Sequence, residues 1–207
     1  FLPDDDRGTV AVPGRFVAFL AVLLVFSLGN SADAFLLLRL SDAIGSATYV
    51  PLLWSALHVV KASLSTWGGM LSDRLGRKQV ILIGWLLYAV VYLGFAMADS
   101  ARTLIAWFLL YGVYFALTEG AEKALVADLA PARKHGMAFG SYNAALGVGA
   151  LAASVLFGLL YERFGAPTAF ATGAALATTA AILLMGIRTS DTDVKMRGSH
   201  AQNSPYQ

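Results

Sequence analysis

The sequence contains no cysteine, which excludes a disulfide framework and any metal site built from thiolates. Charged residues are also scarce: they make up 14% of the 207 residues, whereas a soluble domain carries about 25%. So few charges cannot cover a surface that faces water on every side. Because the formal net charge is only +2 and no basic arm is present, we expect no nucleic-acid partner.

The residue patterns that carry enzyme chemistry are missing as well. We find no nucleophile–base arrangement, no metal-ligand cluster and no ATP-binding loop, and His58, His135 and His200 are scattered along the chain. The fragment GVGALA follows no predicted strand, so it is not a nucleotide-binding fingerprint. We therefore predict no enzyme activity and no cofactor, with protons as the candidate coupling ion.

Long apolar runs are what the sequence has in abundance, since 57% of its residues are hydrophobic. A helix needs about 20 mostly apolar residues to cross a bilayer, and a bilayer admits only helices or closed barrels. The runs show no period-two alternation, so we predict an all-α membrane protein with six transmembrane helices. The predicted spans are 15–40, 46–71, 79–97, 103–128, 136–161 and 167–187.

The ends of the chain differ from this apolar body. We divide the chain into a cytoplasmic linker at 1–14, a six-helix transmembrane bundle at 15–188 and a polar tail, expected to be disordered, at 189–207. The tail contains MRGSH, which resembles a vector-encoded tag leader, so we expect the tail to have no role in the function. The first residue is Phe1 rather than Met, which indicates a fragment or a processed product.

Most basic residues flank one end of the predicted spans. The side of a membrane protein that is richer in Lys and Arg faces the cytoplasm. We therefore expect an integral protein of a bacterial inner membrane with both termini cytoplasmic. The predicted cytoplasmic side carries Arg7, Arg15, Arg74, Arg77, Lys78, Arg133, Lys134, Arg188, Lys195 and Arg197, and the other side carries Arg39, Arg102 and Arg163.

A cluster of charge and glycine, GGMLSDRLGRK, separates the second and third spans. Glycine permits a tight turn, and arginine offers a rigid fork for a carboxylate. An aspartate here can accept hydrogen bonds from the free N–H groups of a neighbouring helix. Asp128 lies at matching depth, so we predict that Arg77 or Arg74 pairs with it. The cluster either latches helices together reversibly or only fixes the orientation. The candidate gating loop comprises Gly69, Asp73, Arg74, Gly76, Arg77, Lys78 and Asp128.

This stretch resembles the signature loop of the major facilitator superfamily of transporters, G-x-L-[AS]-D-R-x-G-R-[RK]. The stretch TEGAEKALVADLAPARKHGMAFG is similar to the fourth-to-fifth helix region of that family. The resemblance implies one six-helix half of a twelve-helix transporter, built from 3+3 inverted repeats around a central cavity. LGNSADAFLLLR looks like the seventh helix of some members, which favours the carboxyl-terminal half. The other half is then a missing amino-terminal half or a second copy in a homodimer.

Ionisable residues are unevenly distributed among the spans. Spans 79–97 and 167–187 contain none between their ends, and in the resembling family the third and sixth helices stand outside the cavity. Ionisable groups at mid-membrane depth usually face the bundle interior or a wet cavity. Three polar pairs have the i, i+3 spacing of one helix face. They are Asn30 and Asp33, His58 and Lys61, and Glu119 and Glu122.

Two interpretations of these residues stay open. In the functional one, Asp33 or Glu119 carries protons, and Lys61 is its partner or contacts an anion. In the structural one, His58 or Lys61 neutralises Asp33, and Lys123 neutralises Glu119. The structural interpretation is preferred for Glu122 and Lys123, which lie nearer the cytoplasm. The candidate solute and proton pathway comprises Asn30, Asp33, His58, Lys61, Glu119 and Asn143.

Two functions from different classes follow from these observations. The first is a secondary transporter that moves a small solute by alternating access, coupled to protons. The second is a transport-incompetent membrane module, a truncated half that serves as an assembly or partner domain. The buried charges favour the first, and the half-length favours the second. Expected partners are the lipid bilayer, a small-molecule solute and a second six-helix half.

Overall fold

The computed structural model describes residues 13–187, and all regular secondary structure in that range is helical. The predicted all-α class is therefore confirmed. Nearly all of the predicted linker and the whole predicted tail lie outside the described residues. Among the described residues, four stretches are long and apolar enough to cross a membrane, and this count does not by itself confirm the predicted six helices. The four stretches are Gly14–Ile44, Arg77–Met97, Ala101–Leu129 and His135–Gly186.

The first of these stretches is interrupted. Helix α1 (Gly14–Gly29) and helix α2 (Asp33–Ile44) are separated by residues 30–32, so the predicted span 15–40 lies within one apolar stretch that is broken into two helices. Ala32 has extended backbone angles (φ −58°, ψ 138°). The hydroxyl of Tyr88 donates to the carbonyl oxygen of Gly29 at 2.8 Å. A helix break at membrane depth is tolerated where such contacts satisfy the freed backbone groups.

Helix α3 (Val50–Leu75) follows a short 3-10 turn, η1 (Ala47–Tyr49), and leads almost directly into α4 (Arg77–Met97). Pro51 lies in the first turn of α3, where its missing N–H costs nothing. Gly76 alone joins α3 to α4 with φ 97°, a backbone conformation that only glycine adopts easily. Helix α3 is not among the four apolar stretches, because Ser, Thr, His and Lys residues are spread along it.

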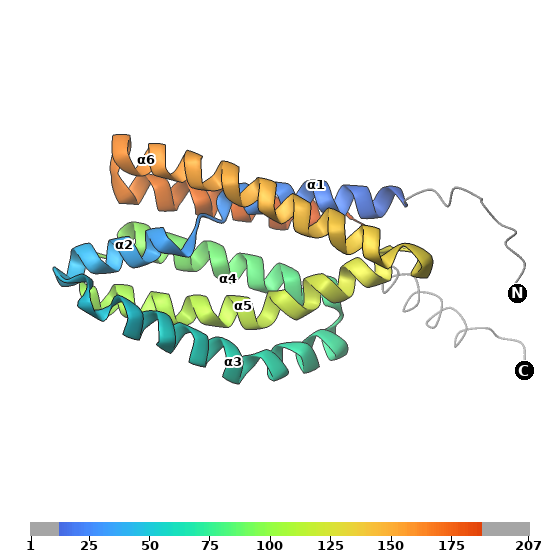
Figure 1. The fold of residues 1–207 in the computed structure, drawn as a ribbon, viewed down its shortest axis with the longest axis horizontal. Coiled ribbons are helices and arrows are strands. Elements are labelled where there is room, and N and C mark those ends of the chain that lie inside the picture. Colours follow the sequence, from blue (N-terminus) through green and yellow to red (C-terminus); the bar gives the residue numbers. More distant parts are fainter. Residues whose placement is uncertain (1–12, 188–207) are drawn as a thin grey trace, which may run out of the picture.

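Helix α5 (Ala101–Leu129) is capped at its N-terminus by Ser100, whose hydroxyl oxygen accepts the N–H of Thr103 at 3.2 Å. A second 3-10 turn, η2 (Ala132–Lys134), leads into α6 (His135–Gly186). The chain reverses inside α6 at Gly165, where φ is 83°. Two antiparallel arms result, 135–164 and 166–186, and they correspond to the predicted spans 136–161 and 167–187 (Figure 1).

The helices pack in layers around α4 (Figure 1). Helix α1 packs against α6, α3 packs against α5, and α4 contacts both α5 and α6. Helix α2 turns toward α5 and α3, while its Phe35 and Asp42 side chains still contact the aromatic side chains of α6. The break at residues 30–32 therefore lets the first stretch contact both layers.

Aromatic side chains from α4 fill the centre of this packing. Trp85 stacks on Phe26 of α1, with their ring centroids 4.4 Å apart, and Tyr88 stacks on Tyr92 at 4.1 Å. The opposite face of α4 is apolar and exposed. Its exposed residues recur every three or four positions and include Ile83, Leu86, Val90 and Leu93. This pattern is typical of a helix with one face toward lipid, as expected for the span without ionisable residues.

The two ends of the bundle carry different connections (Figure 1). The start of α1, the turn at Gly76, the α5–α6 connection and the last residues of α6 lie together at one end. The η1 turn, the α4–α5 connection and the reversal at Gly165 lie at the other end. The basic residues of these connections therefore separate as predicted, with the loop from Arg74 to Lys78 at the first end.

Candidate functional site

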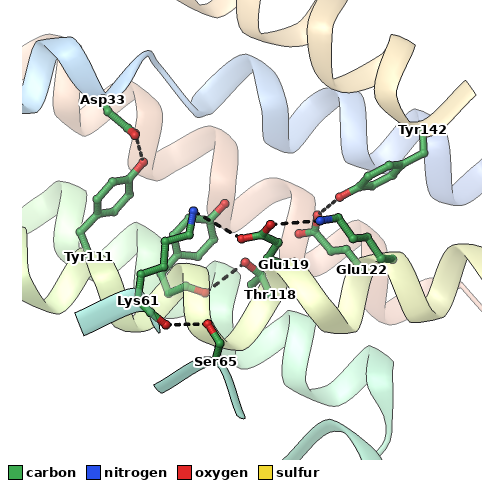
Figure 2. Close-up of polar contacts among 10 residues, drawn as sticks. Asp33, Lys61, Ser65, Tyr111, Thr118, Glu119, Glu122 and Tyr142 are labelled. Atoms are coloured by element: carbon green, nitrogen blue, oxygen red, sulfur yellow. Dashed lines mark hydrogen bonds and ion pairs between the residues drawn. The ribbon is translucent and has the colours of Figure 1, made fainter. Parts of the chain in front are cut away.

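A row of charged and hydroxyl side chains runs between α2, α3, α5 and α6 (Figure 2). Asp33 is the first residue of α2, Lys61 lies near the middle of α3, and Glu119 lies in the second half of α5. Glu122 follows one turn later on α5, opposite Tyr142 of α6. Helices that are distant in the sequence thus supply the side chains of this row, which we call the polar strip.

Lys61 and Glu119 form the centre of the strip. Nζ of Lys61 lies 3.3 Å from Oε2 of Glu119, and Nζ of Lys123 lies 3.0 Å from Oε1 of the same carboxylate. The pairing of Glu119 with Lys123 is thus confirmed. The side chain of Glu119 is 50% exposed and that of Lys61 is 28% exposed. One carboxylate with two ammonium partners is therefore accessible from the surface of this bundle.

Phe115 forms an aromatic face beside this ion pair. It lies one turn before Glu119 on α5, and Nζ of Lys61 stands 4.0 Å from the centroid of its ring. An ammonium group above an aromatic face is attracted by the negative charge density of the ring. Lys61 is consequently held by a carboxylate and an aromatic ring together.

Asp33 has a hydrogen-bond partner that the sequence did not indicate. The hydroxyl of Tyr111 donates to Oδ1 of Asp33 at 2.7 Å. In the described part of the chain, neither His58 nor Lys61 forms an ion pair or hydrogen bond with this carboxylate, but both lie near enough to interact with its charge. The neutralising role expected for them stays a prediction. Lys61 instead turns toward Glu119, and Asp33 begins α2, where the positive end of the helix dipole favours a carboxylate.

The other predicted pathway residues lie apart from this contact network. His58 is exposed, its Nδ1 is 2.9 Å from the carbonyl oxygen of Trp54, and its ring lies against the Trp54 ring. Asn143 is exposed on α6, and Asn30 lies in the helix break, with its backbone N–H bonded to α1 carbonyls. The strip therefore includes Asp33, Lys61 and Glu119. Within the described residues, His58 and Asn143 form no hydrogen bond or ion pair with them, although His58 interacts with the charge of Asp33.

Glu122 is the residue that the sequence interpretation undervalued. Its side chain is 5% exposed, although it is only three positions from the half-exposed Glu119. It accepts hydrogen bonds from Nε1 of Trp85 and from the hydroxyl of Tyr142, each at 2.9 Å. Glu122 thus joins α4, α5 and α6 through neutral donors. The sequence does contain the two donors, a Trp and a Tyr on other predicted spans. It does not show that the helix faces that carry them meet the face that carries Glu122.

The candidate gating loop makes contacts at the basic end of the bundle. Arg77 forms an ion pair with Asp128, which confirms one of the two predicted pairings. Nη1 of Arg77 also donates to the carbonyl oxygen of Ala124 at 3.0 Å. Nζ of Lys78 donates to the carbonyl oxygens of Met185 and Ile187 at 2.9 and 2.7 Å. One turn therefore fastens the end of α5 and the end of α6.

Other members of the loop remain exposed. Asp73 and Arg74 are exposed, and within residues 13–187 the structure gives them no ion pair. A Cβ atom added to Gly69 would meet no atom within 4 Å, whereas one added to Gly68 would overlap the carbonyl group of Ala116. Within this bundle, Gly68 rather than Gly69 is the glycine that close helix packing requires.

Metal binding finds no support in this part of the molecule. No group of three His, Asp or Glu side chains within residues 13–187 is arranged to hold a metal ion. The polar strip offers instead carboxylates, ammonium groups and tyrosine hydroxyls, which bind and transfer protons or contact charged solutes.

Comparisons with known proteins agree with the signature loop. The sequence profile of the Major Facilitator Superfamily matches residues 16–204. An uncharacterized MFS-type transporter of Methanocaldococcus jannaschii is 32% identical over 186 residues, which cover 87% of this chain and 46% of the relative. The similarity points to a transporter rather than an enzyme, as predicted.

Two further relatives are bacterial. An uncharacterized MFS-type transporter of Bacillus subtilis is 33% identical over 128 residues, which cover 60% of this chain and 30% of the relative. The quinolone resistance protein NorA of Staphylococcus aureus is 25% identical over 147 residues, which cover 71% of this chain and 38% of the relative. The chain spans less than half of the length of each of these relatives.

Proposed function

This chain belongs to the Major Facilitator Superfamily, and we propose on that premise that it forms one six-helix half of a secondary transporter. The transporter moves a small solute by alternating access and couples this movement to protons. The six proposed crossings are α1 with α2, α3, α4, α5 and each of the two arms of α6. The proposed location is a bacterial inner membrane, with the basic end of the bundle in the cytoplasm.

The observation that carries this proposal is the exposure of the Lys61–Glu119 pair. Glu119 is half exposed, whereas the exposed face of α4 is apolar. A charged side chain facing lipid near mid-membrane costs a few kcal/mol or more, so it faces a bundle interior or a water-filled cavity. The pair is therefore proposed to line a hydrated cavity.

A cavity of this kind needs an opposite wall. We propose that a second six-helix half supplies it, either an amino-terminal half or a second copy related by a two-fold axis along the membrane normal. The mass of the protein in detergent, from light scattering, separates the two arrangements. A dimer supports the second copy, and a monomer of the bare chain argues against it.

Asp33 is the proposed proton carrier, with Glu119 as the alternative. Asp33 is half-buried, and Tyr111 is a neutral donor that stabilises the ionised carboxylate without cancelling its charge. We expect Asp33→Asn to reduce proton-driven solute uptake into proteoliposomes to the level of protein-free liposomes. Exchange of solute at equal pH on both sides should continue, because exchange requires no net proton movement.

The matched control is Asp42→Asn, which changes an exposed carboxylate of the same helix that is bonded to Tyr161. We expect this variant to keep both activities. Gradient-driven uptake by folded Asp33→Asn protein at the normal rate would exclude Asp33 as the carrier. If the folded wild-type protein moves neither solute nor protons, the alternative of a transport-incompetent assembly module replaces this proposal.

A further inference from the structure

The ammonium group of Lys61 occupies a site that α5 builds. The site consists of the Glu119 carboxylate, 3.3 Å from Nζ, and the Phe115 ring, whose centroid is 4.0 Å from Nζ (Figure 2 shows the carboxylate side). A carboxylate beside an aromatic face is the combination that recognises ammonium and quaternary ammonium ions. Lys61 itself comes from another helix, α3, so the carboxylate and the ring remain in place on α5 when the Lys61 side chain moves away.

Lys61 is held in a way that lets another cation replace it. Its side chain is 28% exposed, and the carboxylate that binds it is half open to the surface. An ion pair with this exposure contributes little net free energy. Lys123 holds the second oxygen of Glu119, so the carboxylate keeps one partner when Lys61 swings away.

We propose that Glu119 and Phe115 form a binding site for an organic ammonium ion, and that Lys61 is a tethered competitor that fills this site when it is empty. The proposal rests on the proposed function, because it requires the strip to face a water-filled cavity. Binding moves the Lys61 ammonium into the cavity, and release of the ligand lets it return.

The test measures binding of benzyltrimethylammonium to the purified full protein in detergent by isothermal titration calorimetry. This probe keeps its charge at every pH. In Lys61→Met the dissociation constant should fall about tenfold, because the tethered competitor is gone while the carboxylate and the ring remain. Benzyl alcohol, which is neutral, should bind the two proteins equally.

The matched control is Lys123→Met, which removes the same charge from the same carboxylate without touching Phe115. Its dissociation constant should change less than about threefold. Adding Phe115→Leu to Lys61→Met should reverse the gain. Lys61→Gln serves in place of Lys61→Met if the latter does not elute as a single folded species.

Two results would overturn the proposal: unchanged or weaker binding in Lys61→Met, or an equal gain in Lys61→Met and Lys123→Met. The second result would reduce the effect to general electrostatics. Solute flux is measured separately on the same proteins. The expected binding pattern without flux would keep the ammonium site and remove the transport proposal, and flux without this pattern would do the reverse.

Discussion

At the scale of single residues, Glu119 and Glu122 illustrate how finely helix rotation controls environment. Each residue advances about 100° around an α-helix, so positions three apart point about 60° away from each other. That difference places Glu119 at the surface with two lysines and Glu122 in the core with Trp85 and Tyr142. Spacing identifies a shared side of a helix, but it does not determine which residue is buried.

Two adjacent glycines give a prediction at this scale. Gly68→Ala should lower the thermal midpoint of the protein in detergent, because the new methyl group collides with the backbone of Ala116 on α5. Overpacking of this kind costs about 1–3 kcal/mol. Gly69→Ala should leave the midpoint of the monomeric bundle nearly unchanged, because its methyl group enters open space. Equal midpoints for the two variants would contradict the packing described here.

At the scale of secondary-structure elements, the interrupted first stretch is held by tyrosine hydroxyls. Tyr88 bonds to the carbonyl of Gly29, Tyr92 bonds to Ser31 at 3.0 Å, and Tyr111 bonds to Asp33. The three rings come from α4 and α5, so neighbouring helices fix both sides of the break. Asp33 owes its position to this arrangement.

Tyr88→Phe tests whether that contact stabilises the break. The substitution leaves the buried carbonyl of Gly29 without its donor, which costs about 1–3 kcal/mol. We expect the amides in the first turn of α2 to exchange with deuterium at least about fivefold faster. Tyr161→Phe, which removes the longer and exposed contact with Asp42, should leave this exchange unchanged. Unaltered exchange in Tyr88→Phe would mean that the break is stable without the tyrosine hydroxyl.

At the scale of the whole molecule, the turn at Gly76 fastens separate helices at the basic end. Arg77 contacts α5 through Asp128 and Ala124, and Lys78 contacts the last carbonyls of α6. Asp73 projects from the same loop and is exposed. If the loop is a latch, the partner of Asp73 belongs to the second six-helix half.

The latch gives a kinetic prediction that depends on the proposed function. Asp73→Asn should change the maximal rate of solute transport severalfold while leaving the apparent affinity for solute nearly unchanged, because Asp73 lies about three helical turns from Lys61 along α3. Asp99→Asn is the control, since Asp99 is almost fully exposed at the opposite end of the bundle. A normal rate in Asp73→Asn would argue that the loop only fixes membrane orientation.

The sequence predicted the features that depend on local pattern. Hydropathy located the helices, and charge and spacing located the pairs Arg77–Asp128 and Glu119–Lys123. The helix break was missed because hydropathy is averaged over a window much longer than the three residues of the break. The partner of Asp33 was missed because it depends on how α5 is rotated toward α2, which is decided by packing between distant segments.

The reversal at Gly165 has a mechanical consequence. A single residue joins the two arms of α6, so the arms stay side by side at that end of the bundle whatever happens elsewhere. Any spreading of the arms must therefore occur at the opposite end, where the second arm is held to α4 because Lys78 donates to the carbonyl oxygens of Met185 and Ile187. Releasing that lysine would free the end of the second arm from α4 on the basic side alone.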